Sequence, residues 1–120
     1  MHITVLQGKI HHAVVTAKDL GYHGSLTVDE DLLEQAGLLV GQQIQVYNGN
    51  NGARFETYLI RGRRGSGEMQ VNGPASRLVE VGDTIVVAAF AQMTPDEAKR
   101  FTPKVVICDR DNRVLETIVY

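Results

Sequence analysis

The chain has 120 residues, enough for one domain, and its 43% hydrophobic and 22% charged residues are typical of a folded globular protein. Twelve basic and 14 acidic residues give a net charge of −2, which argues against a general nucleic-acid binder, because such proteins usually carry a basic excess. The single cysteine excludes an intramolecular disulfide, a cysteine zinc cage and a CxxC redox pair. No apolar run approaches the roughly 18 residues that cross a bilayer, and the first residues lack the order of a signal peptide, so we expect a cytoplasmic protein without a membrane partner.

Twelve glycines and three prolines punctuate short apolar stretches, a pattern that predicts many short strands joined by tight turns. The expected strands, in chain order, cover Ile3 to Gln7, Ile10 to Ala17, Ser25 to Val28, Gln43 to Tyr47, Arg54 to Ile60, Glu68 to Val71, Thr84 to Ala91, Lys104 to Cys108 and Val114 to Val119. Asn48 to Gly52 and Asp109 to Asn112 are predicted turns, since Asn, Asp and Gly tolerate the backbone angles of tight turns.

Only two short helices are expected. Thr27 to Glu30 fits a capping box for the first helix, which Gly37 would end. Thr94, followed by Pro95 at the first helical position, would begin the second helix. The composition and the pattern therefore predict a mainly β fold in a single domain, 1–120.

Two segments of the chain are weakly alike. Val40 to Val46 and Val81 to Val87 share Val, Gly, Ile and Val at matching positions, and each enters a strand through its glycine. The match indicates two related halves forming a small closed barrel, or it is coincidence between β-rich segments. Closure would remove the exposed edges of such a strand-rich chain.

The segment from Lys9 to His12 carries the first candidate functional groups. Side chains alternate along a strand, so Lys9 and His11 should share one face. The adjacent His11 and His12 should point to opposite faces and make a poor metal pair. No other His, Cys or carboxylate stands at a zinc spacing, so we expect no metal site.

Polar side chains also gather on one expected strand, where Arg54, Glu56 and Tyr58 share a face and Thr57 faces the other way. A guanidinium matches a carboxylate, and a phenol remains a proton donor at neutral pH. A structural salt bridge with a packed tyrosine would explain the same pattern.

Three further segments are weak signals when taken alone. Gly24-Ser25 reads as a plain turn. Asn72-Gly73-Pro74-Ala75 is a turn whose amides could hold an anion, although Pro74 donates none. Arg61 to Arg64 concentrates positive charge in a predicted solvated hairpin, without the ending of a phosphate-binding loop.

Taken together, four motifs resemble the bacterial aspartate 1-decarboxylase family in order and spacing. They are Leu6 to His11, Tyr22 to Ser25, Asn51 to Tyr58 and Val71 to Ala75, and the likeness runs from about residue 3 to residue 108. The resemblance implies a double-psi β-barrel with short helices, assembled as a homotetramer with active sites at subunit boundaries. It also implies that the precursor cuts itself between Gly24 and Ser25, giving chains 1–24 and 25–120 with a pyruvoyl group derived from Ser25. Whether an accessory maturation protein assists is left open.

The reaction implied by the resemblance is decarboxylation of L-aspartate to β-alanine and carbon dioxide, supplying pantothenate biosynthesis. The pyruvoyl group would form a Schiff base with the substrate amine and act as the electron sink, without metal or pyridoxal phosphate. The residues that match the family motifs are Lys9 and Arg54 for the substrate carboxylates, Tyr58 as proton donor, Thr57, Gly73, Pro74 and Ala75 as substrate contacts, and His11, Tyr22 and Asn72 in support.

Two positions resist this assignment. Thr57 and Tyr58 can serve one site only if the strand ends nearby or is irregular, so we predict a bulge near residue 57. Thr57 is also the expected partner of the oxyanion that develops at a strained Gly24–Ser25 peptide. At residue 74 many relatives carry alanine, which makes the contacts of Pro74 the least typical of the set.

Two alternatives belong to other classes. Leu26 to Val46 resembles the swapped-hairpin DNA-binding regulators, in which case the Arg61 to Arg64 cluster would contact phosphates. An unprocessed relative serving as a scaffold is the other alternative. The net charge and the register of the four motifs favour the decarboxylase, with no nucleic-acid partner.

Overall fold

The structure is a computed structural model that describes all 120 residues, and it confirms a mainly β fold. In chain order the elements are β1 (Ile3–Val14), β2 (Ala17–Asp19), β3 (Ser25–Asp29), α1 (Glu30–Ala36), β4 (Gln43–Asn48), β5 (Arg54–Gly62), β6 (Met69–Asn72), the 3-10 helix η1 (Gly73–Leu78), β7 (Thr84–Met93), α2 (Pro95–Arg100), β8 (Lys104–Cys108) and β9 (Val114–Val119). Both predicted turns are present, between β4 and β5 and between β8 and β9.

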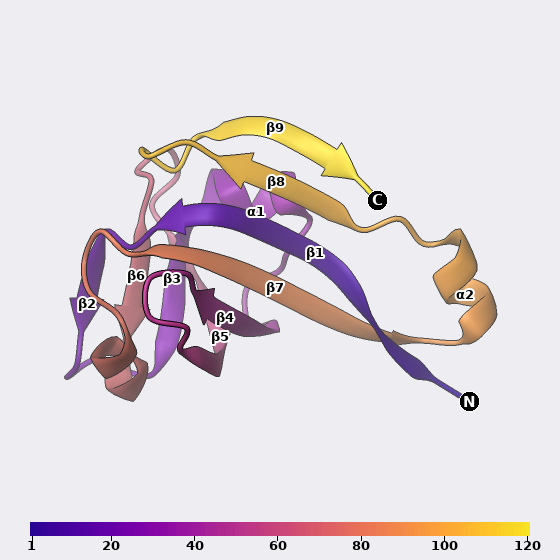
Figure 1. Cartoon of the computed structure of the whole chain (residues 1–120), viewed down its shortest axis with the longest axis horizontal. Helices are drawn as coiled ribbons and strands as arrows, with labels where there is room; N and C mark the ends of the chain where they lie inside the picture. The colour runs from indigo at the N-terminus through magenta and orange to yellow at the C-terminus, as the bar shows by residue number, and fades with distance from the viewer.

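All nine strands belong to one mixed, curled sheet in the order β2-β6-β3-β5-β4-β7-β1-β8-β9. Three of its pairs are parallel, namely β2–β6, β3–β5 and β1–β8. This curled sheet is consistent with the predicted β-barrel, although hydrogen bonds do not close it: β2 and β9 each have a single neighbour. Figure 1 shows β9 lying outside β8, while the short β2 lies at the far side beside β6.

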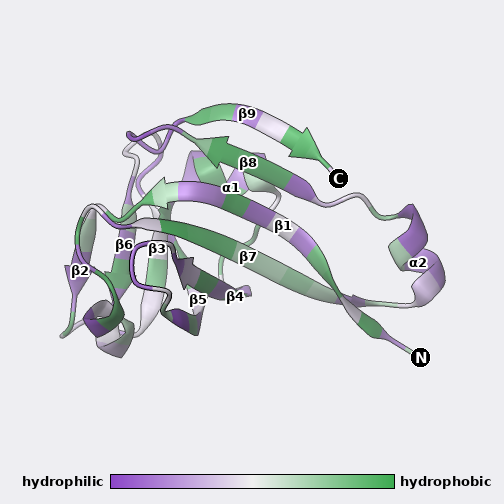
Figure 2. Ribbon diagram, in the orientation of Figure 1, coloured by the Kyte–Doolittle hydropathy of each residue, from purple (hydrophilic) through white to green (hydrophobic).

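The inner face of the curled sheet holds the core, and its side chains come from alternate positions of the strands. Ile10, Leu26 and Leu59 are fully buried there, and Leu32 and Leu33 of α1 pack against the same cluster. The alternate side chains between these core positions therefore face the outside of the sheet. Figure 2 shows hydrophobic stretches along β7 and β8 and hydrophilic ones on α2 and the turns.

The strand β1 differs from the prediction of two strands broken near Gly8, because it is continuous with two irregularities. The first lies between Leu6 and Gly8 in its pairing with β7. A Cβ on Gly8 would lie 2.8 Å from the Ala36 carbonyl oxygen, so the end of α1 can approach β1 only at a glycine. The motif glycine is thus explained by packing.

The second irregularity, between Ile10 and Ala13, overturns the expectation that His11 and His12 face opposite ways. His12 has φ = 63°, in the left-handed region, and its ring stacks on that of His11 at a centroid distance of 3.7 Å. The bulge breaks the alternation on which the prediction relied.

The first helix begins differently from the prediction. Thr27 lies within β3, and Asp29 is the N-cap, with its carboxylate accepting from the Asp31 amide. The capping box at Thr27 is therefore wrong, whereas Gly37 ends α1 in the left-handed conformation as predicted. The second helix has the predicted Thr94 cap with Pro95 at the first position.

The two similar segments form neighbouring antiparallel strands, β4 and β7, with Val46 opposite Val87. Each enters its strand after a glycine with positive φ, 86° at Gly41 and 97° at Gly82. Each glycine amide donates to a carbonyl of another segment, Leu59 and Val15 respectively. The repeated sequence thus corresponds to a repeated local structure, which favours two related halves over coincidence.

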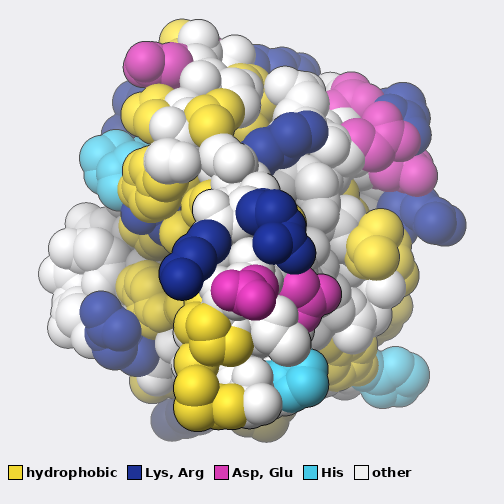
Figure 3. All heavy atoms as spheres, turned by 90° about the vertical axis from the view of Figure 1, so that its right-hand side faces the viewer, with side chains coloured by type: hydrophobic (Ala, Val, Ile, Leu, Met, Phe, Trp, Pro, Cys, Tyr) yellow, Lys and Arg dark blue, Asp and Glu magenta, His cyan; other side chains and the backbone are white.

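The molecule measures 42 × 28 × 25 Å, and its length comes from β1 and β7, which extend together toward α2 (Figure 1). Acidic side chains occupy the first turn of α2 and basic ones the last turn. Figure 3, which faces this end, shows basic and acidic side chains close together, so the face is not uniformly basic. No helix has the length and apolar character that crossing a membrane requires.

Candidate active site

Ser25 is the first residue of β3 and only 1% exposed. Its hydroxyl donates to the His23 carbonyl at 3.0 Å, and its Oγ accepts from Asn72 Nδ2 at 3.0 Å. The register of β3 and β6 places Ser25 directly opposite Asn72. The serine is therefore held by two hydrogen bonds, and neither involves the Gly24 carbonyl.

The peptide before Ser25 lies against the start of η1. The predicted turn from Asn72 to Ala75 is instead a strand end followed by this 3-10 helix, with Pro74 near its first position. Gly73 has φ = 76°, and a Cβ there would lie 2.6 Å from Gly24 Cα, so only glycine permits this approach. Neither Gly24 nor Ser25 has a positive φ, so the left-handed backbone of the site belongs to Gly73.

The packing of Pro74 completes this region. A Cβ on Gly24 would lie 3.9 Å from Pro74 Cδ, an ordinary van der Waals distance, so the proline flanks the glycine without crowding it. We call Gly24, Ser25, Asn72 and Gly73 the cleavage pocket. It lies within one chain, where Ser25, Asn72 and Gly73 are buried and Gly24 is exposed.

Thr27 and Gln70, which the sequence did not single out as site residues, also belong to this region. Asn72 Nδ2 donates its second hydrogen to Thr27 Oγ1 at 2.9 Å, and Asn72 Oδ1 accepts from Gln70 Nε2 at 2.7 Å. Asn72 is completely buried, so all its polar hydrogens and its oxygen are engaged. Alternation along the strands could have identified both residues. Thr27 follows Ser25 by two residues and Gln70 precedes Asn72 by two, so each should share a face of its strand with the site residue.

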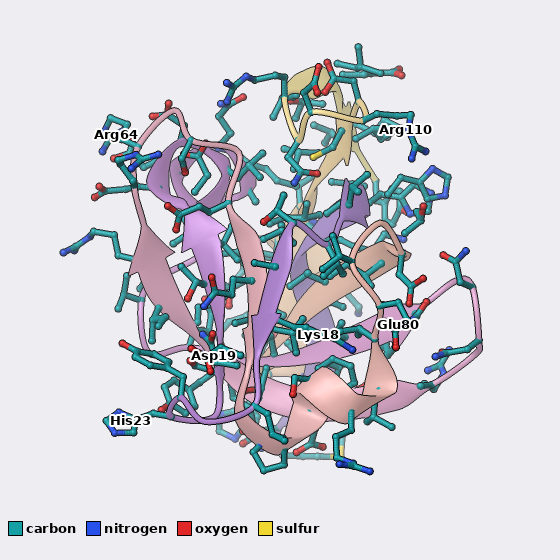
Figure 4. All side chains as sticks on the ribbon, turned by 90° about the vertical axis from the view of Figure 1, so that its left-hand side faces the viewer. Lys18, Asp19, His23, Arg64, Glu80 and Arg110 are labelled. Atoms are coloured by element: carbon teal, nitrogen blue, oxygen red, sulfur yellow. The ribbon has the colours of Figure 1, made fainter.

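The loop before the cleavage pocket is exposed. Tyr22 is 49% exposed and its ring stacks on His23 with centroids 5.3 Å apart. Figure 4 shows His23 projecting from this loop, at the opposite end of the view from Arg64 and Arg110. Tyr22 therefore borders the pocket through its backbone: its carbonyl oxygen lies 3.3 Å from the place of a Cβ on Gly73.

Tyr58 lies beside the cleavage pocket. The parallel register pairs Leu26 with Leu59, so Ser25 and Tyr58 occupy the preceding positions of adjacent strands and leave the same face. Tyr58 is 43% exposed, whereas Ser25 is buried. The phenol is thus the solvent-facing neighbour of the serine.

The predicted bulge near residue 57 is wrong. β5 pairs with β4 in unbroken register from Arg54 to Tyr58, with Thr57 opposite Ile44. Instead, β5 changes partner after Tyr58 and continues beside β3. Thr57 therefore shares the face of Leu59, away from Ser25 and Tyr58, and its assigned role has no bulge to support it.

The two cations assigned to substrate carboxylates have no carboxylate partner in the chain. Lys9 Nζ lies 5.6 Å from the ring centroid of Tyr120, and the Arg54 guanidinium carbon lies 4.0 Å from that of Tyr47. Neither cation takes part in a salt bridge, which removes the alternative that Arg54 serves a structural ion pair. We call Lys9, Arg54 and their two tyrosines the cation face.

His11 lies near this face. Burial, the neighbouring His12 and Lys9 together lower the pKa of His11, and its Nδ1 is buried without a hydrogen-bond partner. A neutral imidazole is therefore favoured next to Lys9. No group of three or more His, Cys, Asp or Glu is arranged to hold a metal ion.

The fold does not bring the cleavage pocket and Lys9 together within one chain. Three strands separate β3 from β1, and four inter-strand steps amount to about 19 Å along the sheet. Arg54 precedes Tyr58 by four residues, or about 13 Å of strand. The three main surface grooves contain neither Ser25, Lys9 nor Arg54.

Two of the three arginines of the Arg61 to Arg64 cluster form ion pairs within the chain, whereas Arg63 forms none. Arg61 pairs with Glu30, and Arg64 pairs with Glu30, Asp31 and Glu34 of α1. The segment is also a connection from β5 to β6, which lie on opposite sides of β3, and not a hairpin. These contacts weaken the DNA-binding alternative.

Comparison with known proteins identifies close relatives. The family model described as aspartate decarboxylase matches residues 1–115. The aspartate 1-decarboxylase of Chloroherpeton thalassium is 51% identical over 113 residues, 94% of this chain and 83% of that protein. Those of Caldicellulosiruptor saccharolyticus and Staphylococcus aureus are 49% and 48% identical, covering 97% and 96% of this chain and 91% of each relative. Since the family model covers residues 1–115 and these relatives are 48–51% identical over nearly the whole chain, the chain belongs to the aspartate decarboxylase family.

Proposed function

We propose that the chain is the precursor of a pyruvoyl-dependent decarboxylase that converts L-aspartate to β-alanine and carbon dioxide, in the service of pantothenate synthesis. The observation that carries the proposal is the cleavage pocket, in which a buried serine follows a glycine that another glycine contacts closely. Membership of the family and the unpaired cations of the cation face support the choice of a substrate with two carboxylates.

Self-cleavage would begin with rotation of the Ser25 hydroxyl away from the His23 carbonyl. Its Oγ then bonds to the Gly24 carbonyl carbon, the amide C–N bond breaks, and the proton moves from Oγ to nitrogen, giving an ester. Loss of the Ser25 α-proton and cleavage of the Cβ–Oγ bond release Gly24 as a carboxylate and leave dehydroalanine. Water then displaces ammonia, which leaves the pyruvoyl group at residue 25. We assign the hydrogen bond from Asn72 to the first step, where charge develops on Oγ.

The residues around Ser25 fit a small group of this kind. Gly73 leaves no side chain over the junction, and Tyr58 lies at the adjacent strand position. When present, the pyruvoyl carbonyl condenses with an amine and accepts the electrons that a departing carboxylate leaves behind. We assign to Tyr58 the return of a proton to the substrate carbon, and we propose that the amides of Gly73 and Ala75 contact the substrate beside Pro74.

Lys9 and Arg54 are proposed to bind the substrate carboxylates, with Thr57 as a weaker candidate because its side chain leaves the opposite face of β5. The distance of about 19 Å along the sheet between Ser25 and Lys9 exceeds the span of an aspartate. We therefore propose that the cation face of one chain completes the cleavage pocket of another in a homotetramer. His11 would hold its place beside Lys9, and Tyr22 would border the junction.

The test combines intact mass with an activity assay on freshly purified protein. Two species, 1–24 and 25–120, with a pyruvoyl mass at the start of the larger, and release of carbon dioxide from L-aspartate are expected. The Ser25→Ala variant should remain folded, uncut and inactive. Decarboxylation by this variant, or full-length wild-type protein after prolonged warm incubation with no activity, would contradict the proposal.

A further inference from the structure

A chain of hydrogen bonds leads from Gln70 to the serine of the cleavage pocket. Gln70 Nε2 donates to Asn72 Oδ1 at 2.7 Å, and Asn72 Nδ2 donates to Ser25 Oγ at 3.0 Å and to Thr27 Oγ1 at 2.9 Å. The register of β3 and β6 sets Ser25 opposite Asn72 and Thr27 opposite Gln70, so all four side chains leave one face of the same strand pair. On the other side of β6, Ala17 of β2 is the register partner of Gln70.

The direction of these bonds decides what Ser25 can do. With the amide hydrogens of Asn72 on Ser25 Oγ, the serine must donate its own hydrogen elsewhere, and it does so to the His23 carbonyl. The opposite orientation of Asn72 would place Oδ1 against Ser25 and make the serine hydroxyl the donor to Asn72. A carboxamide can adopt either orientation, so its neighbours determine which one is present.

Gln70 is the neighbour that distinguishes the two orientations. Thr27 and Ser25 carry hydroxyls, which can donate or accept and therefore tolerate both. Gln70 presents an amide donor to Asn72 Oδ1, and reversing Asn72 alone would set two NH2 groups against each other, so the orientation of Asn72 is coupled to that of Gln70. Because Asn72 is fully buried, water does not compensate for that mismatch.

We propose that Gln70 is a positioning residue for self-cleavage, which orients the Asn72 amide so that it donates to Ser25 Oγ. An amide donor at Oγ stabilises the negative charge that builds there as the hydroxyl loses its proton, and it leaves that proton free to depart toward another acceptor. Gln70 acts through Asn72 and does not touch Ser25 itself. The inference rests on the proposed self-cleavage at Gly24–Ser25.

The deciding variant is Gln70→Glu, which keeps the shape of the side chain but replaces its amide donor by a carboxylate at neutral pH. Asn72 should then turn its NH2 group toward Glu and its oxygen toward Ser25. We expect the rate of cleavage, followed by intact mass on fresh precursor at pH 7.5, to fall about tenfold or more. Near pH 4.5 a protonated Glu can donate again, so the deficit relative to wild type should shrink.

Gln92→Glu is the matched control, because Gln92 is exposed at the far end of the β1–β7 pair and makes the same change of charge. It should cleave at the wild-type rate at both pH values. Gln70→Leu removes the donor without adding charge and should be slow at every pH, which separates loss of orientation from a charge effect. Circular dichroism and thermal melts establish that each precursor is folded.

The outcomes distinguish this inference from the function on which it rests. Wild-type cleavage with equally fast cleavage of folded Gln70→Glu and Gln70→Leu overturns the role of Gln70 alone. A slow Gln70→Glu whose deficit does not change with pH also contradicts it, because a merely structural defect would behave that way. A wild-type chain that never cleaves overturns both.

Discussion

The cleavage pocket and the cation face are built in opposite ways. In the cleavage pocket, Ser25 and Asn72 are almost completely buried and every polar atom of Asn72 has a partner. On the cation face, Lys9 and Arg54 lie on the outside of the sheet against tyrosine rings, without an anion. The buried side-chain polar groups of the first region are satisfied within the chain, whereas the two cations of the second have no anionic partner there.

The difference follows from the chemistry proposed for each region. An intramolecular cleavage has both reacting groups in the same chain, so the packing of β3, β6 and η1 can hold them before any ligand arrives. A carboxylate site must leave its cations unneutralised until the substrate binds. Changes in the pocket should therefore impair cleavage, whereas changes on the cation face should impair only the mature reaction.

The largest effect is expected for Gly73→Ala. The new Cβ would lie 2.6 Å from Gly24 Cα, so the junction must move, and the rate of cleavage should fall on the order of 100-fold or more. Gly52→Ala is the control: Gly52 has φ = 77°, like Gly73, but nothing within 4 Å of the added atom. It should lose about 1–2 kcal/mol of stability and still cleave normally. Equal cleavage by the two variants in intact-mass time courses would show that the contact with Gly24 is unimportant.

The next effect, on turnover, is expected for Tyr58→Phe. Removing the phenol should leave cleavage intact, because Tyr58 makes no hydrogen bond in the pocket, but lower kcat about 100-fold or more through loss of the proton donor. Initial rates of carbon dioxide release, normalised to cleaved chain, measure it. A fully active Tyr58→Phe enzyme would show that Tyr58 is not the proton donor. A variant that fails to cleave would show that Tyr58 is also needed for self-cleavage, against the separation of the two roles.

A stability effect is expected at the far end of the strand that carries Ser25. Burial alone would raise the pKa of the Asp29 carboxyl, but hydrogen bonds from the Gly67, Asp31 and Gly65 amides, with Arg113 nearby, lower it below 3.8. The carboxylate therefore stabilises the fold fully above about pH 5, and this contribution disappears as the pH falls through the lowered pKa.

Asp29→Asn should accordingly lose about 2–3 kcal/mol of unfolding free energy at pH 7, and its deficit should shrink below about pH 4. Denaturant titrations at pH 7 and pH 3.5 measure both. Asp31→Asn, which alters an exposed ion pair of the same helix, should cost much less. A deficit that stays constant between the two pH values would contradict the role assigned to the Asp29 charge.

The smallest effect is expected for Tyr47→Leu on the cation face. Its ring lies 4.0 Å from the Arg54 guanidinium, and a cation–π contact at an exposed site contributes about 0.5–1 kcal/mol. The KM for L-aspartate should rise about two- to fivefold, with kcat and cleavage unchanged. Tyr47→Phe, which keeps the aromatic ring, should resemble the wild type. A Tyr47→Leu variant with an unchanged KM would show that the ring does not position Arg54.

Local chemistry makes several elements of this fold predictable from the sequence. Thr94 and Pro95 specify a helix start within four residues, and the backbone preferences of Asn and Gly indicate the turn before β5, which residues Leu78 to Thr84 also hold by hydrogen bonds. Where a prediction used strict alternation it held on the regular β5, but failed at His12, because the bulge in β1 arises from its pairing with β7.

The N-cap of α1 is a second feature that local sequence does not determine. Thr27 and Asp29 are both good capping residues, and local sequence does not choose between them. The choice falls to Asp29 because Gly65 and Gly67, more than 30 residues away, also donate to its carboxylate. A distant loop therefore sets the first residue of the helix.

The sequence alone determined the mainly β class, the helix starts and turns that depend on neighbouring residues, and the family, since all of these are written in short-range patterns. Tertiary structure decided that the sheet stays open between β2 and β9, that Gly73 touches Gly24, and that Gln70 and Thr27 join Asn72 at the serine. It also decided that three strands lie between β1, which carries Lys9, and β3, which carries Ser25 and Thr27. The physical reason is that strand order and register bring together residues about 45 positions apart. The interactions that stabilise such a pairing involve both segments, so neither segment's sequence predicts it alone.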